Sequence, residues 1–486
     1  MPEAMATPVG WIAPRLAVFG LASLLCSGCI ASLEGNQPRE VNREVPKSYG
    51  EAASAAAVPQ APSLAQKTWN EFFTSAELRE LIAAALKNNQ ELNLQMQEII
   101  VARSEVSARR GEVYPKVTAG LGVGVEKGST YTSQGQADEV TGVPEHLPDF
   151  AFGLKASWEV DIWKKLRNAA QAADLRYLAT VEGRDFMVTE IVAELARSYY
   201  ELIALDSQLE VLERNVQIQA QALEIVRLQK EAARVTELAV QRFEAEVLKN
   251  RSRRFDLQQK RIQAENRINF LVGRYPQPVA RNAEELKVAL PKRIETGLPV
   301  DLLGNRPDVR QAELELEAAK LDVQVAKAAY YPSLSLDTGI GYRSFDFTKL
   351  VATPESLLYS VAAGLTAPLF NWTGITAQYR AANARQIQTV TRYERTLLQA
   401  YVDVANQLSA VDNTRQAYEL QAQQVETLAR SVEVSNVLFQ SARADYMEVL
   451  LTRRDSLEAE MEAIEARKAQ FDAMIGVYQA LGGGWR

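Results

Sequence analysis

One stretch of the chain decides the fold: Leu298-Pro299-Val300-Asp301-Leu302-Leu303-Gly304-Asn305-Arg306-Pro307-Asp308-Val309. Pro307 suits a first helical turn, because its fixed φ matches the helix and its missing N–H needs no partner there. Asp308 adds negative charge near the same N-terminus, where the helix dipole favours it. Tyr331-Pro332 predicts the end of this helix, because the residue before a proline avoids the α region. Residues 334–342 then alternate apolar with small or polar side chains, which predicts a strand with one apolar face.

The same unit occurs earlier in the chain. Tyr114-Pro115 and Tyr331-Pro332 lie 217 positions apart, and the same spacing separates Gly122-Val123-Gly124 from Gly339-Ile340-Gly341. A repeat of this length indicates two copies of one structural unit. We expect repeat 1 over residues 76–280 and repeat 2 over residues 281–486, each with helices, two strands and a helical hairpin.

The first 75 residues differ in composition from the two repeats. An apolar run ends at Cys26-Ser27-Gly28-Cys29, which is typical of a secretory signal over residues 1–28. Small residues before Cys29 resemble the bacterial lipobox, although Cys26 stands where that motif usually has leucine. We therefore predict lipidation of Cys29, with an ordinary cleaved signal as the alternative. Residues 29–75 then form a lipid-anchored, extended leader.

Four segments of about ten residues alternate strictly between apolar and polar side chains. They begin near Val117, Phe150, Ser333 and Tyr359, and a polar loop is expected over residues 127–148. This pattern is typical of a transmembrane β-barrel, and a soluble sandwich is the alternative. Four strands cannot close a barrel with a lumen, and open edges are not tolerated in lipid, so several chains must share one barrel.

Long helices separate the strand pairs. No proline occurs between Asp149 and Tyr275, and the pattern is helical from Lys164 to about Val235, on the order of 100 Å at ~1.5 Å per residue. Apolar residues recur at coiled-coil spacing in both repeats. The helices are expected to turn back around residues 232–237 and 442–446.

With these residues in view, the chain resembles the TolC-like outer membrane factor family, and within it the lipoprotein branch. The resemblance rests on Leu298–Val309, on Pro368-Leu369-Phe370-Asn371, and on the terminal Ala480-Leu481-Gly482-Gly483-Gly484-Trp485. It implies a mainly α protein with membrane β-structure. Three chains would each give four strands to one 12-stranded β-barrel, which continues as a long α-helical tunnel in the periplasm.

The resemblance also implies the partners and the place of action. Such channels are exit ducts in the outer membrane of Gram-negative bacteria, and they serve tripartite efflux pumps. An inner-membrane transporter supplies the energy, and a periplasmic adaptor protein joins it to the helical turns. We expect an efflux duct for small molecules, with a type I protein secretion duct as the alternative.

The residues at the helical turns depart from the family pattern. Ala233 and Ala442 take places where the family often has glycine, and Leu451 takes the place of an acidic gate residue. The residues expected to contact the adaptor are Ala233, Arg234, Thr236, Ala442, Arg443 and Asp445. The candidates for a periplasmic gate are Ala239, Gln241, Met447, Glu448, Leu451 and Arg454. We hypothesise closure by apolar contacts and by pairing of Arg454 with Glu448 or Asp455, whereas the simpler interpretation is a solvated, charged helix face.

Other classes of protein fit less well. The formal net charge of −7 argues against nucleic acid as a partner. His146 is the one histidine, and no metal-ligand cluster, P-loop or nucleophile elbow appears, so we expect no cofactor, no metal and no enzymatic activity. A periplasmic coiled-coil adaptor or structural lipoprotein is the alternative of a different class, but it would not need four alternating strands.

Overall fold

The computed structural model describes residues 33, 37–49, 63–291, 294–368, 370, 372–441 and 443–485. The predicted signal segment and Cys29 lie outside these residues. The chain forms two compact units, each built from separate stretches of sequence. Unit 1 comprises residues 1–40, 100–178 and 314–391, and unit 2 comprises residues 41–99, 179–313 and 392–486.

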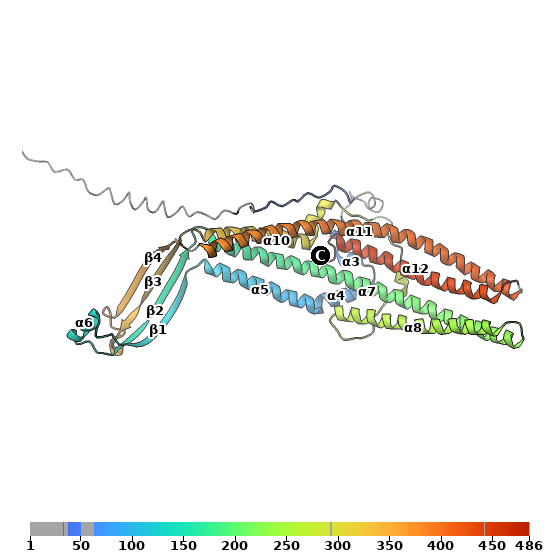
Figure 1. Cartoon of the computed structure of the whole chain (residues 1–486), viewed down its shortest axis with the longest axis horizontal. Coiled ribbons are helices and arrows are strands. Elements are labelled where there is room, and N and C mark those ends of the chain that lie inside the picture. Colours follow the sequence, from blue (N-terminus) through green and yellow to red (C-terminus); the bar gives the residue numbers. More distant parts are fainter. Residues whose placement is uncertain are drawn as a thin grey trace, which may run out of the picture. The chain divides into compact units, whose positions relative to one another are not determined.

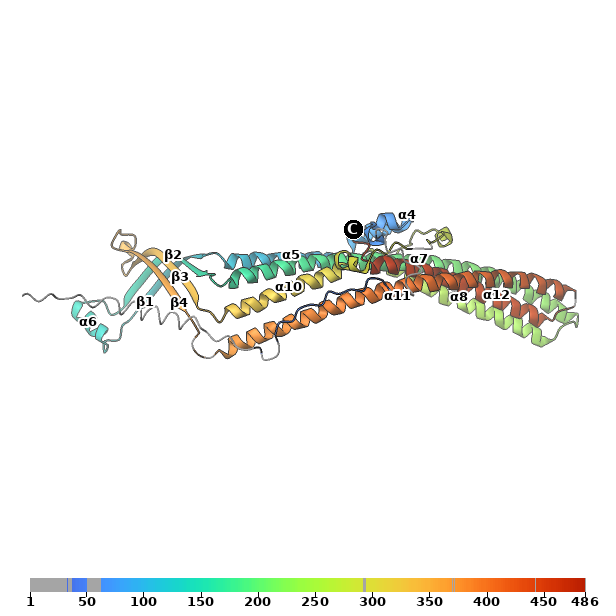
Figure 2. The same ribbon diagram turned by 90° about the horizontal axis from the view of Figure 1, so that it is seen from above.

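Unit 1 contains the predicted strands. They are β1 (Lys116–Glu126), β2 (Leu147–Val160), β3 (Ser333–Ser344) and β4 (Leu357–Thr366). They form one sheet in the order β1-β2-β3-β4, and each neighbouring pair is antiparallel. Figures 1 and 2 show the strands side by side in a strongly twisted sheet. The predicted four strands are therefore confirmed, and β2 and β3 bring the two repeats together.

Two tryptophans fasten the sheet to the helix ends that precede it. The indole Nε1 of Trp158 donates to the carbonyl of Val113, one residue after α5 (Gln90–Glu112), over 2.9 Å. The indole Nε1 of Trp163 donates to the carbonyl of Pro332 over 2.8 Å, and its ring stacks on Tyr331. Both Tyr-Pro junctions thus receive a partly buried hydrogen bond from the segment around the end of β2.

The expectation of a continuous polar loop after β1 was wrong. Helix α6 (Ser133–Thr141) lies within it. The hydroxyl of Thr132 accepts from the amide of Gly135 at its start, and Gly142 ends it with a positive φ of 72°. These are ordinary capping signals, but they enclose too few apolar residues to produce a helical period.

Long helices supply most of the remaining chain. They are α4 (Ala76–Asn88), α5, α7 (Lys165–Glu231), α8 (Glu237–Leu271), α10 (Pro307–Ala328), α11 (Thr373–Gln440) and α12 (Tyr446–Ala480). Short helical turns are η1 (Leu64–Gln66), α3 (Trp69–Phe72), η2 (Ala283–Lys287), η3 (Pro299–Asp301), α9 (Leu302–Asn305) and η4 (Phe347–Lys349). The predicted start of a helix at Pro307 and both predicted turns are confirmed. Among the described residues, no helix is long and apolar enough to cross a bilayer.

The core of unit 2 lies where α7 and α12 pack together. The largest side chains with under 2% exposure include Tyr199, Leu202, Leu212, Ile268 and Tyr478. The ring of Tyr200 on α7 stacks on Phe471 of α12, with centroids 4.3 Å apart. Aromatic packing of this kind adds to the free energy of burial and joins the two repeats.

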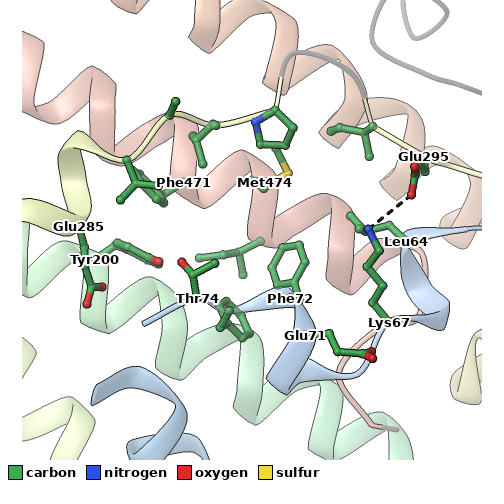
Figure 3. Close-up of a pocket in the computed structure, with 17 residues that line it drawn as sticks. Leu64, Lys67, Glu71, Phe72, Thr74, Tyr200, Glu285, Glu295, Phe471 and Met474 are labelled. Atoms are coloured by element: carbon green, nitrogen blue, oxygen red, sulfur yellow. Dashed lines mark hydrogen bonds and ion pairs between the residues drawn. The ribbon is translucent and has the colours of Figure 1, made fainter. Parts of the chain in front are cut away.

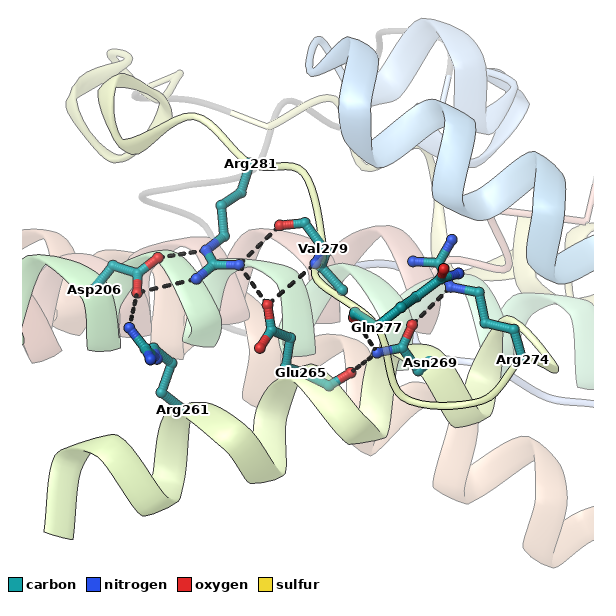
Figure 4. Close-up of polar contacts among 8 residues, drawn as sticks. All are labelled: Asp206, Arg261, Glu265, Asn269, Arg274, Gln277, Val279 and Arg281. Atoms are coloured by element: carbon teal, nitrogen blue, oxygen red, sulfur yellow. Dashed lines mark hydrogen bonds and ion pairs between the residues drawn. The ribbon is translucent and has the colours of Figure 1, made fainter. Parts of the chain in front are cut away.

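A polar clamp holds the loop after α8 against the helices. Arg281 in this loop donates to Asp206 on α7, and it donates to Glu265 on α8 over 2.8 Å. Figure 4 shows the guanidinium between the two carboxylates, with Arg261 on the far side of Asp206. Because the Arg281 side chain is only 19% exposed, these charge-assisted bonds are poorly screened by water.

The described part of the leader is tied down along α11. In unit 1, the backbone N–H and carbonyl of Arg39 both bond to the side-chain amide of Gln386, over 3.3 Å and 3.1 Å. In unit 2, Tyr401 donates to the carbonyl of Ser48 over 2.9 Å and stacks on Tyr49. Residues 37–46 form neither helix nor strand, whereas the short helical turns η1 and α3 lie within residues 29–75, where an extended leader was expected.

Candidate functional site

The outer strands of the sheet each have a partner on one side only, within the described residues. β1 and β4 are the two edges, and 11 and 10 residues of backbone line them. An edge strand presents unpaired N–H and C=O groups, which bind another strand readily. The sheet therefore ends in two long edges with which a neighbouring strand can pair.

One face of this sheet is apolar on all four strands. The register places Leu121 beside Phe152, Phe152 beside Tyr342, and Ile340 beside Tyr359. Leu121 is 81% exposed and Val361 is 82% exposed. The opposite face is mainly polar or small, and it includes a ladder row of three glycines, Gly120, Gly153 and Gly341. A sheet with one strongly exposed apolar face is suited to contact with lipid.

The turn between α7 and α8 has a well-defined geometry. The amide of Arg234 donates to the carbonyl of Gln229 over 2.8 Å, and that of Ala233 donates to Lys230 over 2.9 Å. This pair of bonds is a Schellman motif, in which the residue just after the helix, here Ala233, adopts the left-handed conformation. Ala233 accordingly has a φ of 57°. The place where the family often has glycine is therefore a place where glycine is physically favoured.

The turn between α11 and α12 repeats part of this pattern. The amide of Arg443 donates to the carbonyl of Leu438 over 2.8 Å, 209 positions after the equivalent pair in the first turn. Thr236 and Asp445 occupy the N-cap positions of α8 and α12. Arg234, Thr236, Arg443 and Asp445 are all exposed, whereas Ala442 lies outside the described residues.

An ion pair bridges the first turn. Lys230 on α7 lies 2.7 Å from Glu237 on α8. The hydrogen bond from Lys230 holds the pKa of the Glu237 carboxyl below its usual range, so the pair stays charged at neutral and mildly acidic pH. Both groups are solvent-exposed, and the bridge therefore orients the turn more than it stabilises the fold.

Behind the turns, the hairpins of both repeats share an apolar cluster, here called the tip cluster. It connects α7, α8 and α12, and Tyr446 and Met447 pack against its buried residues. The buried residues are Leu223, Val226, Ala239, Val240, Phe243, Val247 and Leu450. The two hairpins can move apart only if these apolar contacts are broken.

The predicted gate residues fall into two groups. Ala239 is fully buried in the tip cluster, and Met447 packs against it while its sulfur accepts from Arg242 over 3.3 Å. Gln241 and Glu448 are exposed, and Leu451 is 40% exposed and lies outside the cluster. Glu448 lines an open groove between α11 and α12, together with Leu438 and Thr452. The structure therefore brings together Ala239 and Met447, but not the other candidates.

Two neighbouring arginines on α12 have different surroundings. Arg454 pairs with Asp455 at 3.0 Å, one of the two partners expected for it, and both side chains are partly exposed. Arg453 is half-buried and donates to Asn436 on α11 over 2.9 Å, while its Nε has no hydrogen-bond partner among the described residues. Burial lowers the pKa of the Arg453 guanidinium, although the group stays charged at physiological pH.

Sequence reasoning missed the aromatic members of this region. Phe243 is 3% exposed, and its ring lies 6.5 Å from that of Tyr446 across the two hairpins. A signal was present, because Val240, Phe243 and Val247 follow the 3-4 spacing of a coiled-coil seam.

The model of the outer membrane efflux protein family matches residues 81–274 and 298–483, which cover both repeats. The chain belongs to this family. It is an outer membrane channel of an efflux system in a Gram-negative bacterium, and the family is not enzymatic. The two matched segments also confirm the duplication.

Curated relatives of this efflux channel span nearly its whole length. It is 28% identical to the pyoverdine export outer membrane protein OpmQ of Pseudomonas aeruginosa, over 86% of this chain and 88% of the relative. It is 27% identical to the cation efflux system protein CusC of Escherichia coli O6:H1, with the same coverage. Its fold is similar to that of the outer-membrane channel OprN, with a TM-score of 0.83, 22% identity, and coverage of 92% of this chain and 98% of that one.

Proposed function

We propose that three copies of this chain close one 12-stranded barrel and work as the exit duct of a tripartite pump. The observation that carries this proposal is the sheet with two unpaired edges and one apolar face. Four strands are too few to enclose a lumen, and lipid tolerates no open edge. β1 of one copy then pairs with β4 of the next, which satisfies both edges at once.

The sheet predicts which side chains meet lipid. Leu121, Phe152, Ile340 and Tyr359 share the apolar face, so this face contacts the bilayer. Lys116, Lys155 and Asp337 belong to the opposite face, which lines an aqueous lumen. A duct of this kind holds no energy source, and an inner-membrane transporter supplies it.

The closure of the barrel is testable by cysteine cross-linking. Leu121 on β1 is changed to cysteine together with one residue of β4, taken in turn from Tyr359, Val361, Ala363 and Leu365. We expect at least one pair to give covalent dimers and trimers under oxidation, because the register allows one close pairing between neighbouring copies. The matched control places one cysteine on β1 and the other on β3, because β3 is internal and has no free edge. Only monomers from every β1–β4 pair would contradict the proposal.

We propose that the exposed turns contact a periplasmic adaptor. Ala233, Arg234 and Thr236 form the first turn, and Arg443 and Asp445 belong to the second, with Ala442 between α11 and α12 in sequence. Each turn has the same backbone hydrogen bond, from the amide of residue 234 to the carbonyl of residue 229 and from the amide of residue 443 to the carbonyl of residue 438. This similarity supports one recognition geometry used twice per chain.

Growth inhibition of a deletion strain tests both export and the role of the turns. Antibiotics, dyes, detergents and metal salts are compared in strains complemented with the intact gene or with the double variant Arg234→Glu/Arg443→Glu. We expect the intact gene to restore resistance and the variant to fail, although its trimer still forms. The matched control is Arg251→Glu on the exposed face of α8, which should complement fully. Full complementation by the double variant would contradict the role of the turns.

We propose that the resting periplasmic end is closed by apolar contacts. The tip cluster places Ala239 and Met447 between the hairpins, Leu451 remains available to a neighbouring copy, and Gln241 and Glu448 are exposed beside them. Leu451→Ser is expected to raise the resting conductance of the channel in planar bilayers. Phe243→Ala should do the same by loosening the cluster, and an unchanged resting conductance in both variants would contradict the apolar seal.

We propose that Cys29 carries the lipid anchor. The described leader supports this assignment, because Arg39 and Ser48 are fastened to α11 rather than free. Two or more acyl chains would be needed for stable attachment. Incorporation of labelled palmitate into the intact chain, and its loss in Cys29→Ser, is the test.

A further inference from the structure

A half-enclosed pocket of about 320 Å³ lies in unit 2. It is bordered by η1, α3, α7 and α12, and by residues 288–291 and 294–295 (Figure 3). Cavities of roughly this size hold small organic molecules in proteins.

The walls of this pocket are mainly apolar. Phe73, Ile294 and Ile475 are 2–3% exposed, and Phe471 and Met474 complete the wall that α12 supplies. A space of this size lined by apolar groups gives water few partners, so it favours an apolar occupant.

One hydroxyl that faces this space has no hydrogen-bond partner among the described residues. Tyr200 is 6% exposed, and in Figure 3 its hydroxyl points into the pocket. No described residue hydrogen-bonds to it, whereas the hydroxyl of the adjacent Tyr199 meets Ser75 and Glu285, each at 3.2 Å. Burial, and next the charge of Glu285, raise the pKa of the Tyr200 phenol, so it remains a protonated donor. This hydroxyl is open to the pocket and can donate to an acceptor on an occupant.

Two charged groups at the rim, Lys67 and Glu71, already have partners. Lys67 pairs with Glu295 at 3.4 Å, and Glu71 accepts from the backbone of Thr68 over 2.8 Å at the start of α3. Among the described residues, the pocket therefore offers no unpaired cation that would hold an anionic ligand. The Glu285 carboxyl in the lining has one oxygen without a partner among the described residues, and burial raises the pKa of this carboxyl, which favours its neutral form. The lining therefore favours a neutral molecule.

We propose that this pocket binds a neutral, mainly apolar small molecule with one hydrogen-bond acceptor, which receives the hydroxyl proton of Tyr200. The site does not depend on the proposed assembly of the duct. Because α7 and α12 both border it, an occupant contacts both repeats and stabilises their packing.

Benzophenone is a suitable probe, because it is neutral and apolar, carries one carbonyl acceptor, and cross-links to nearby C–H bonds under light. The full-length channel in lipid nanodiscs is illuminated with it, and the labelled peptides are identified by mass spectrometry. We expect saturable labelling of peptides that contain Phe72-Phe73 or Met474. Tyr200→Phe should weaken this labelling about fivefold to tenfold, the loss of one net hydrogen bond.

Diphenylmethane separates the hydrogen bond from apolar burial, because it has the same rings with a CH₂ in place of the carbonyl. We expect it to compete for the site with equal affinity in wild type and in Tyr200→Phe. Met474→Trp should abolish labelling by filling the pocket, and Tyr275→Phe, at a 94% exposed position, should change nothing. Labelling that avoids the pocket peptides, or that is the same in wild type and Tyr200→Phe, would overturn the proposal.

Discussion

Arg306 donates from Nη1 to the carbonyl oxygen of Ala480 over 2.9 Å, and this bond joins the residue before α10 to the last residue of α12. The guanidinium is 8% exposed, and it also reaches both carboxylate oxygens of Asp308, at 3.0 Å and 2.8 Å. Asp403 on α11 lies 3.4 Å away. A carbonyl at a helix C-terminus lacks an intrahelical partner, so Arg306 satisfies it while holding three helices together.

Replacing this arginine should be costly. Arg306→Met leaves two carboxylates and one carbonyl with no cation, and we expect a loss of about 3–5 kcal/mol in the free energy of unfolding. Denaturant unfolding of the detergent-solubilised channel measures it. Arg430→Met is the matched control, because its pair with Glu426 is about 70% exposed and should contribute at most ~1 kcal/mol. Equal losses in the two variants would contradict the role given to Arg306.

A glycine in place of Ala233 should stabilise the turn after α7. Ala233 has a φ of 57°, a conformation that costs an L-residue roughly 1 kcal/mol and glycine almost nothing. Ala233→Gly is therefore expected to raise stability by about 1 kcal/mol in denaturant unfolding. Ala232→Gly, one residue earlier and outside the left-handed region, should be neutral or destabilising. A loss of stability in Ala233→Gly would contradict a left-handed backbone conformation at this position.

Replacing glycine with alanine should affect the assembly of the channel differently at different positions of the glycine row in the sheet. A Cβ on Gly341 would lie within 3.0 Å of the backbone of Phe152, because β2 and β3 approach closely there, whereas a Cβ on Gly120 would have no neighbour within 4 Å. Gly341→Ala should lower the yield of heat-resistant trimer in outer membranes, by a penalty of about 1–3 kcal/mol for overpacking. Gly120→Ala is the control in the same row, and equal yields for both variants would contradict this assignment.

A partly buried carboxyl, that of Asp472, should make stability depend on pH. Asp472 on α12 lies 3.7 Å from Lys468, yet one of its oxygens has no hydrogen-bond partner among the described residues. Burial raises the pKa of the Asp472 carboxyl, with Lys468 and Arg197 opposing and Glu201 and Glu465 reinforcing that rise. The folded state therefore favours the neutral acid, and stability falls as the pH rises from about 3.8 through the raised pKa.

Asp472→Asn should remove this dependence. We expect a higher unfolding temperature than wild type at pH 7.5 and nearly the same one at pH 4, because only the charged form is penalised. Thermal unfolding at a series of pH values is the measurement. A variant that loses stability equally at both pH values would show that the pairing with Lys468 dominates instead.

Helix ends that carry local signals were predictable. Pro307 starts α10, and Tyr331-Pro332 follows its end, because proline acts on the backbone of its own neighbours. Helix α3 was missed although its signal was present: the backbone N–H of Thr68 donates to Glu71, the reciprocal bond of a capping box. A helix of four residues has no apolar period, so only the cap could have revealed it.

The functional residues were predictable only in part. The turns were located correctly, because both repeats carry them at the same spacing. The members of the tip cluster were not predicted as a group. Leu450 and Leu451 are the same residue type, and only the packing of the helices makes Leu450 8% exposed and Leu451 40% exposed.

By itself, the sequence determined the elements of this protein: two repeats, four alternating strands, and helices that turn back near residues 232 and 442. These follow from interactions within a few residues, namely side-chain period, capping and the restrictions of proline. Only the tertiary structure decided that Arg306 meets Ala480, that Gly153 and Gly341 share one row, and that the Tyr200 hydroxyl faces a pocket. Such contacts join residues far apart in the chain, and their positions depend on how whole helices and strands pack, which no local pattern encodes.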